Sequence, residues 1–117
     1  MHVDPEHEIA LVMTIGSGGD ETIIASCRSF ATSAHAAEVA FLVEEDYQGQ
    51  GIAGKLLRHL AGIERERGIT EFEADVLAEN KSMLVVFAKS GFPMRKRPEG
   101  GTVHITLSLV GDPARNA

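Results

Sequence analysis

The feature that most constrains this chain is a glycine-rich stretch over residues 48–54, Gln-Gly-Gln-Gly-Ile-Ala-Gly, which joins a strand-like segment to a helix-like one. Before it, apolar residues alternate with others along 38–43, as they do in a strand. After it, apolar residues recur at helical spacing, at Ile52, Leu56, Leu60 and Ile63. The first N–H groups of a helix lack partners within the helix, and glycines let an anion approach the backbone. This junction therefore predicts a site for a phosphate-bearing ligand.

The remaining segments follow the same two periodicities. Strands are predicted at Glu8–Ile15, Thr22–Phe30, Glu38–Val43, Glu71–Leu77, Met94–Arg97 and Thr102–Val110. Helices are predicted at Gly51–Arg67, with Lys55, Arg58, Glu64 and Arg67 on its solvent side, and at Lys81–Ser90 after an Asn80 N-cap. The order β-β-β-α-β-α-β-β predicts an α/β (α+β) domain over 1–117, with a mixed, mostly antiparallel sheet and two main helices. The polar ends, Met1–Glu6 and Gly111–Ala117, are predicted to be frayed tails.

Composition excludes several classes of function. The net charge of -6 argues against nucleic acid as a partner, since phosphate binding needs a basic face. No apolar run approaches membrane-spanning length and no signal peptide is evident, so we expect a cytoplasmic protein without a membrane partner. The histidines lack cysteine or histidine partners at ligand spacing, so no metal site is predicted, and the single cysteine, Cys27, is expected to be a buried apolar residue.

Three motifs compete for the glycine-rich stretch. Gly49-x-Gly51-x-x-Gly54 matches the dinucleotide fingerprint, but three strands precede it and the chain is too short for a doubly wound fold. Gly49 through Gly54-Lys55 resembles a P-loop, but Leu56 replaces the Ser/Thr that would hold magnesium. The third, Q/R-x-x-G-x-G/A, is matched by Gln48, Gly51 and Ala53.

This third motif resembles the coenzyme A motif of the GNAT superfamily of N-acetyltransferases. The β-meander before it, and Asn80 with Gly91-Phe92 after it, are also typical of that superfamily. The segments 38–41, 47–52, 65–69 and 72–94 are similar to the acetyltransferase domain of bacterial protein lysine acetyltransferases. The resemblance implies direct transfer of an acetyl group from acetyl-CoA to a primary amine, with a protein lysine as the expected acceptor.

The resemblance also implies roles for individual residues. The pyrophosphate of the cofactor is expected on N–H groups between Gln48 and Gly54, that is on Gln48, Gly49, Gln50, Gly51, Ile52, Ala53 and Gly54, with Lys55 nearby. Asn80 is expected to contact the pantetheine arm, and the main chain of Phe41, Leu42 and Val43 to stabilise the oxyanion. Many members carry a tyrosine seven residues after the asparagine to protonate the leaving thiolate. Phe87 stands there and has no proton to give, so water, Ser82 or Ser90 is left for that step.

A lysine amine is protonated at neutral pH, so transfer needs a base. Glu38, ten residues before Gln48, lies close to where related protein acetyltransferases place their catalytic glutamate, and we expect it to be partly buried. Glu73 and Asp75 on the following strand are alternatives that could act through water.

The superfamily usually begins with a strand and two helices that wall the acceptor site, and only Met1–Glu6 precede the first strand predicted here. Without those elements the acceptor groove would be open, and the exposed apolar sheet surface favours a homodimer. Two alternatives stay open: a small-amine acetyltransferase, and a non-catalytic acyl-CoA-binding module or a fragment of a larger protein.

Overall fold

The computed structural model describes residues 8–110, so both predicted tails lie outside the described residues. The strands are β1 (Glu8–Ile15), β2 (Thr22–Ala31), β3 (Ala36–Val43), β4 (Glu71–Leu77), β5 (Met94–Glu99) and β6 (Thr102–Ser108). The helices are α1 (Ile52–Glu66) and α2 (Lys81–Ala88), and a short 3₁₀ turn, η1 (Glu45–Tyr47), precedes α1. The predicted order of strands and main helices is confirmed.

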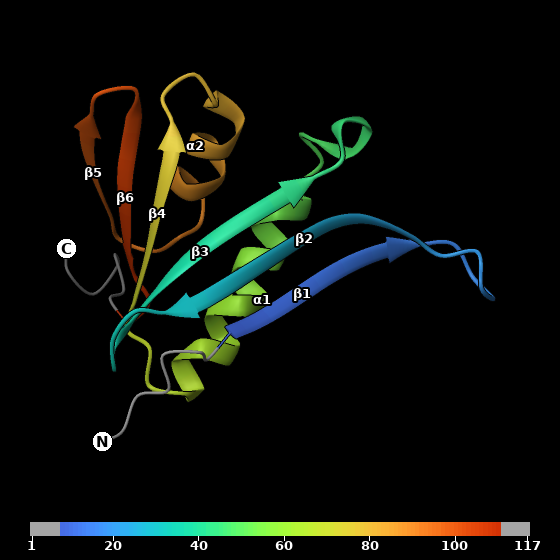
Figure 1. Ribbon diagram of the computed structural model, residues 1–117, viewed down its shortest axis with the longest axis horizontal. Helices are drawn as coiled ribbons and strands as arrows, with labels where there is room; N and C mark the ends of the chain where they lie inside the picture. Colours follow the sequence, from blue (N-terminus) through green and yellow to red (C-terminus); the bar gives the residue numbers. More distant parts are fainter. Residues whose placement is uncertain (1–7, 111–117) are drawn as a thin grey trace.

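The strands form one sheet in the order β1-β2-β3-β4-β6-β5. All neighbours run antiparallel except β3 and β4, which are parallel and joined by the crossover through α1. Their register pairs only Ala36 with Glu71, Ala37 with Phe72 and Glu38 with Glu73. Beyond this last pair the two strands diverge, as Figure 1 shows. The sheet therefore opens at its centre, beside the glycine-rich stretch.

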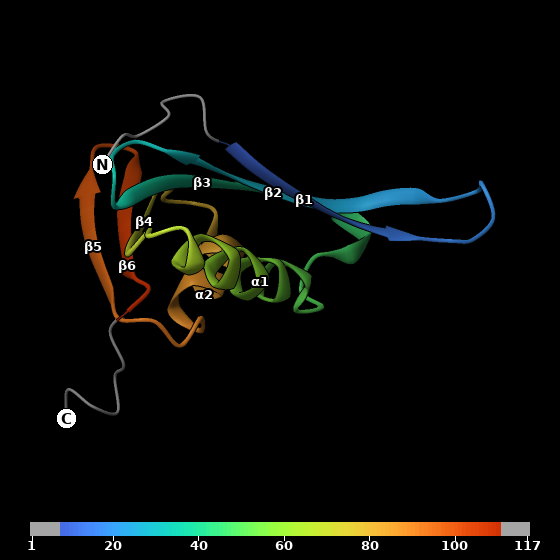
Figure 2. The same ribbon diagram turned by 90° about the horizontal axis from the view of Figure 1, so that it is seen from below.

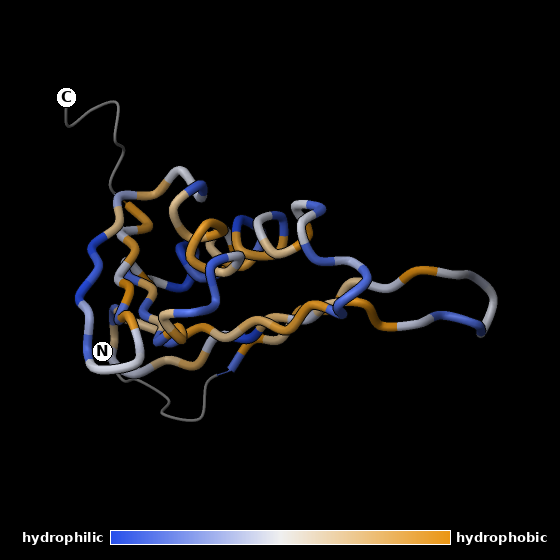
Figure 3. The backbone as a smooth tube through the Cα atoms, turned by 90° about the horizontal axis from the view of Figure 1, so that it is seen from above, coloured by the Kyte–Doolittle hydropathy of each residue, from blue (hydrophilic) through white to orange (hydrophobic). Residues whose placement is uncertain are grey.

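Both helices lie on the same face of the sheet (Figure 2). Their apolar residues and the inward side chains of the strands form one core, in which Leu57, Leu60, Phe72, Ile105 and Leu107 are fully buried. Figure 3 shows these apolar segments facing one another across the layer between helices and strands. Burial of this apolar surface is the main favourable term that holds the helices on the sheet.

The opposite face, here called the outer face, is covered by no helix of the part of the chain that the structure describes. It carries Arg28 and Phe30 on β2 and, in register with them, Ala40 and Glu38 on β3. Phe30 and Leu42 are large apolar side chains that remain exposed, so this face could accept a partner surface. The predicted homodimer stays a prediction.

Several local predictions need correction, among them the strand predicted at Thr102–Val110, which ends at Ser108. Glu64 was predicted on the solvent side of its helix, but it is completely buried, because a hydroxyl inside the core satisfies its carboxylate. Strand β5 continues through Pro98 to Glu99, because it is an edge strand and needs hydrogen bonds on one side only. Helix α2 ends at Ala88 instead of Ser90.

Within residues 8–110 neither helix is long and apolar enough to cross a membrane.

Candidate active site

A cavity of about 550 Å³ lies where β3 and β4 have separated. Its walls come from the end of β3, the glycine-rich stretch with the start of α1, and one side of α2. The lining residues are Phe41, Leu42, Val43, Tyr47, Gln48, Gly49, Gly51, Ile52, Ala53, Gly54, Arg58, Asn80, Ser82, Met83, Val85, Val86 and Lys89. Leu42 belongs to the outer face of β3, whereas Phe41 and Val43 belong to the helix-side face. The cavity therefore reaches the opening in the sheet from the helix side and is lined from both faces of β3.

The glycine-rich stretch presents its backbone to this cavity. Gly49 and Gly51 both adopt a φ of +81°, a left-handed conformation that side chains with a Cβ rarely adopt. Gly51 is the N-cap of α1 and has no side chain to bond the first N–H groups of the helix. A Cβ built on either glycine would meet no atom within 4 Å, so the space beside them is open. An anion could therefore approach the helix N-terminus directly.

The side chain of Gln48 turns back to β3. Its Nε2 donates a hydrogen bond of 3.2 Å to the carbonyl oxygen of Val43. The Gln50 amide likewise donates to the Asp46 carbonyl, at 3.3 Å. These bonds hold the stretch against the turn that precedes it. Gln50 does not line the cavity, so of the two glutamines only Gln48 has a place in its wall.

The free edge of β3 also faces the opening. The Glu44 N–H donates to the Ile24 carbonyl on β2 at 2.8 Å. Hydrogen-bonded and non-bonded pairs alternate along antiparallel strands, so the N–H groups of Val43 and Phe41 point away from β2. They point to the side on which β4 has already separated from β3. Two main-chain donors are thus available at the cavity.

The structure places the other predicted cofactor residues as follows. Asn80 lines the cavity and is also the N-cap of α2, where its side chain accepts a 3.2 Å hydrogen bond from the Met83 N–H. Phe87 is buried and makes an edge contact with Phe41, with 5.9 Å between ring centroids, so it supports the wall from behind. Lys55 is exposed and does not line the cavity.

Several lining residues were not predicted from the sequence. Tyr47 is one, and two cations, Arg58 and Lys89, are others. The Arg58 guanidinium lies 3.4 Å from the point where a Cβ on Gly54 would stand, so it lies over the first turn of α1. Helical spacing does place Arg58 one turn after Gly54, but it gives no direction for the side chain. Met83, Val85 and Val86 line the cavity from α2, and only the packing of α2 decides which side of that helix faces it.

Ser82 and Ser90 were the hydroxyls considered for protonation of a leaving group. Ser82 lines the cavity, and its Oγ donates to the Asn80 Oδ1 at 3.1 Å. Ser90 is buried, and its Oγ accepts a hydrogen bond from the Phe92 N–H. Only Ser82 of the pair lines the cavity.

Glu38 lies on the outer face, in the last β3–β4 pair before the strands separate. It is exposed, and the partial burial predicted for it is wrong, because no described element covers that face. Its register partner, Glu73, points to the same face, since paired residues of neighbouring strands share a side. Two carboxylates therefore stand together at the point where the opening begins.

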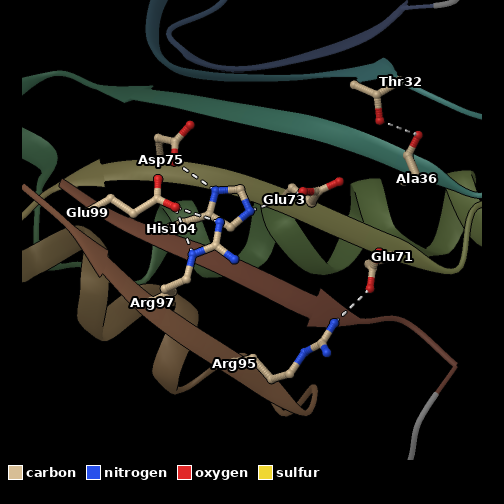
Figure 4. A network of polar contacts seen from close by, with 9 residues as sticks. All are labelled: Thr32, Ala36, Glu71, Glu73, Asp75, Arg95, Arg97, Glu99 and His104. Atoms are coloured by element: carbon tan, nitrogen blue, oxygen red, sulfur yellow. Dashed lines mark hydrogen bonds and ion pairs between the residues drawn. The ribbon is translucent and has the colours of Figure 1, made fainter.

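His104 on β6 extends this group, as Figure 4 shows. Its Nδ1 lies 2.8 Å from Asp75 Oδ1 and its Nε2 lies 3.1 Å from Glu73 Oε1. The hydrogen bond with Asp75 raises the pKa of His104 above its ordinary value, partial burial opposes this, and Glu73 adds to the increase. The sequence does not indicate this arrangement, because His104 is distant from both carboxylates in the chain.

Oxygen and nitrogen atoms of Asp75, Glu99 and His104 lie within 4.8 Å of one another, close enough to suggest cation ligands. Each already has a protein partner: Asp75 and His104 bond each other, and Glu99 is paired with Arg97. These bonds account for the cluster, and we assign no metal to it.

Comparison with known proteins agrees with this geometry. The sequence profile of the acetyltransferase (GNAT) family matches residues 4–92, which is most of the chain. The chain belongs to the GNAT acetyltransferase family. The resemblance inferred from the glycine-rich stretch is therefore confirmed, and the protein is expected to have acyltransferase chemistry.

Three relatives bring the comparison closer. Acetyltransferase Pat of Mycolicibacterium smegmatis is 37% identical over 92 residues, which are 76% of this chain and 27% of that protein. The crystal structure of the GNAT domain of S. lividans PAT superimposes with a TM-score of 0.75 at 36% identity, over 92% of this chain and 64% of that one. A cAMP-binding acyltransferase from Mycobacterium smegmatis gives a TM-score of 0.76 at 29% identity, over 97% of this chain and 36% of that one. The chain thus spans less than two thirds of the length of each of these relatives.

Proposed function

We propose that this GNAT domain transfers the acetyl group of acetyl-CoA to a primary amine, with a protein lysine as the acceptor. The observation that carries the proposal is the opening between β3 and β4, which begins at Glu38 and Glu73 and adjoins the N-terminus of α1. It gives a cofactor bound on the helix side a route to an amine on the outer face. The predicted cytoplasmic location is part of this proposal.

The residues present fit acetyl-CoA. The open space beside Gly49 and Gly51 leaves room for a pyrophosphate at the unpaired N–H groups of α1. Arg58 on α1 and Lys89 at the end of α2 supply positive charge to the lining of the cavity, which matters in a chain of net charge -6. Met83, Val85 and Val86 give the apolar surface that a pantetheine arm can lie along. When bound, acetyl-CoA would supply a thioester carbonyl that an amine can attack.

Glu38 would take the proton from the acceptor amine, directly or through a water molecule. The amine nitrogen then forms a bond with the carbonyl carbon, and the bond from that carbon to sulfur breaks. The Phe41 and Val43 N–H groups are placed to donate to the carbonyl oxygen as it gains charge. The thiolate that leaves would take a proton from water or from Ser82, which lines the cavity.

The choice of a protein lysine as the acceptor rests on two observations. The outer face around Glu38 is open in the described structure, so a lysine on a protein surface can reach it. The similarity to Acetyltransferase Pat and to the GNAT domain of S. lividans PAT points to the branch that the sequence resembles.

The test combines binding with transfer. Calorimetry should show that the protein binds coenzyme A, and thiol release from acetyl-CoA should depend on an added lysine peptide. Glu38→Gln should lower the transfer rate about 100-fold or more, as expected for loss of a general base. Glu66→Gln, on an exposed position of α1, is the matched control and should leave the rate unchanged.

Each other outcome overturns a different part of the proposal. Unchanged thiol release in Glu38→Gln removes Glu38 as the base. Tight coenzyme A binding without transfer to peptide, protein or small amine supports the non-catalytic module. Transfer to small amines only supports the small-amine enzyme, and the absence of coenzyme A binding removes the cofactor site itself.

A further inference from the structure

The imidazole of His104 is held between two carboxylates of the neighbouring strand. Its Nδ1 contacts Asp75 at 2.8 Å and its Nε2 contacts Glu73 at 3.1 Å (Figure 4). Only 20% of the His104 side chain is exposed, against 34% for Glu73 and 54% for Asp75. Both ring nitrogens are therefore used, and the ring has a fixed orientation on the outer face.

Glu73 connects this cluster to the opening. It is the register partner of Glu38 in the last β3–β4 pair, and both side chains are on the outer face. Neighbouring strands lie about 4.8 Å apart, so two carboxylates on paired residues of the same face are close enough to repel each other. The charge near Glu38 therefore depends on how far the charge of Glu73 is neutralised.

The other charged groups of this face are already paired. Arg97, the register partner of His104 on β5, binds Glu99 at 2.6 Å, and Arg95 binds Glu71 at 3.2 Å. On β2, Arg28 binds Glu8 at 3.4 Å. Among the ion pairs of the described residues, His104 is the cation that contacts Glu73.

We propose that His104 is a positioning residue that sets the charge beside Glu38 by neutralising and orienting Glu73. This inference rests on the proposed function, in which Glu38 takes the proton of the acceptor amine. When His104 carries a proton, its bond to Glu73 offsets the negative charge next to Glu38. When that proton is lost, the negative charge of Glu73 beside Glu38 is no longer offset.

His104 would thereby couple the net charge beside Glu38 to pH. The groups that decide its own charge are Glu73 and Asp75 on β4 and the Arg97–Glu99 pair on β5, because these face it. The bond to Asp75 favours the protonated ring, and this is consistent with the raised pKa of His104. Asp75 thus favours the charged form of His104, and His104 acts on Glu73.

The test uses the whole protein and two measurements. The first is the pH midpoint of the NMR chemical shift of the Glu38 side-chain carboxyl carbon. The second is the acidic limb of the pH profile for peptide acetylation. His104→Gln removes the charge that offsets Glu73, so the midpoint measured by NMR should move upward relative to the wild type. Glu73→Gln should move it downward. His59→Gln, exposed on α1, is the control and should move neither readout.

A second comparison isolates the route through Glu73. In a Glu73→Gln background, His104→Gln should shift the Glu38 midpoint less than it does in the wild-type background. At about 1 M salt, where the screening length falls to about 3 Å, the shift should shrink further. The inference is overturned if the shifts are equal in both backgrounds. It is also overturned if His104→Gln gives no shift while its thermal midpoint stays above the assay temperature.

The NMR readout separates this inference from the proposed function. If Glu38→Gln abolishes transfer while His104→Gln leaves the Glu38 midpoint unchanged, only the role of His104 is wrong. If the midpoint shifts as expected but Glu38→Gln keeps the transfer rate, the electrostatic coupling stands and Glu38 is not the base.

Discussion

The hydroxyl of Ser29 donates a 2.5 Å hydrogen bond to the carboxylate of Glu64, and both side chains are fully buried. The bond joins β2 to α1 across the core. Arg67 Nε lies 3.9 Å from the other carboxylate oxygen of Glu64, at the rim of the same site. A polar group with this burial needs partners, since removal from water without them carries a large free-energy cost.

Ser29→Ala is therefore expected to lower the free energy of unfolding by about 1–3 kcal/mol, because Glu64 loses a buried donor. Urea denaturation measures the difference. Ser26→Ala, on the same strand but half-buried, is the matched control and should cost less. Equal losses in the two variants would show that the hydrogen bond to Glu64 contributes little.

Gly51→Ala tests the conformation of the glycine-rich stretch. At a φ of +81°, alanine should cost about 1–2 kcal/mol of stability, and its methyl group would enter the open space in which we propose that the pyrophosphate binds. We expect coenzyme A to bind about tenfold more weakly or worse, as measured by calorimetry. Gly62→Ala, inside α1 where a Cβ meets no atom within 4 Å, should instead stabilise the protein by about 0.5–1 kcal/mol and leave binding unchanged.

Asn80 has two candidate roles that substitutions can separate. Asn80→Ala removes the cap of α2 and should cost about 1 kcal/mol of stability. Asn80→Asp keeps an oxygen for the Met83 N–H but loses the amide and adds a negative charge at the cavity. Its stability should stay close to wild type while its KM for acetyl-CoA rises. If both stability and KM stay at the wild-type values in Asn80→Asp, the residue is a helix cap only.

The raised pKa of His104 predicts how stability depends on pH. The pKa of His104 is higher in the folded chain than in the unfolded chain, where it is about 6.5. Below the unfolded pKa, the protonated ring contributes its full stabilisation of the fold. This contribution is lost as pH rises through the folded pKa. The stability difference between wild type and His104→Gln should therefore be largest between about pH 5 and 6.5 and should shrink above that range. Thermal midpoints measured from about pH 5 to well above pH 6.5 give the measurement, and a difference that grows with pH would contradict the assignment.

Burial raises the pKa of the Cys27 thiol to about 11, against a small opposing effect from the Leu11 backbone. Because the thiolate is the reactive form, the folded protein should react with Ellman's reagent at pH 8 far more slowly than it does in denaturant. Rapid labelling of the folded protein would show that β2 opens readily to solvent. Cys27 is thus buried as the sequence predicts.

The elements of the fold could be predicted because each depends on local chemistry. The alternation along Glu71–Leu77, the helical repeat that starts at Ile52 and the Asn80 cap are all properties of neighbouring residues. The predictions that failed did so because they depend on residues that are distant in the chain. Glu64 looked like a solvent-facing residue because its partner, Ser29, is 35 positions away, and Pro98 looked like a turn because the sequence does not show that β5 is an edge strand.

By itself, the sequence determined the order of the elements, the glycine-rich junction and the family, since these follow from periodicity and from residues close together in the chain. Only the tertiary structure decided where β3 separates from β4, which side of α2 lines the cavity, and that His104 meets Glu73 and Asp75. These relationships join residues about 30 positions apart, and they depend on strand register and sheet order. The glycine-rich stretch therefore predicted a phosphate site by itself, whereas the pairing of strands placed Glu38 at the opening beside it.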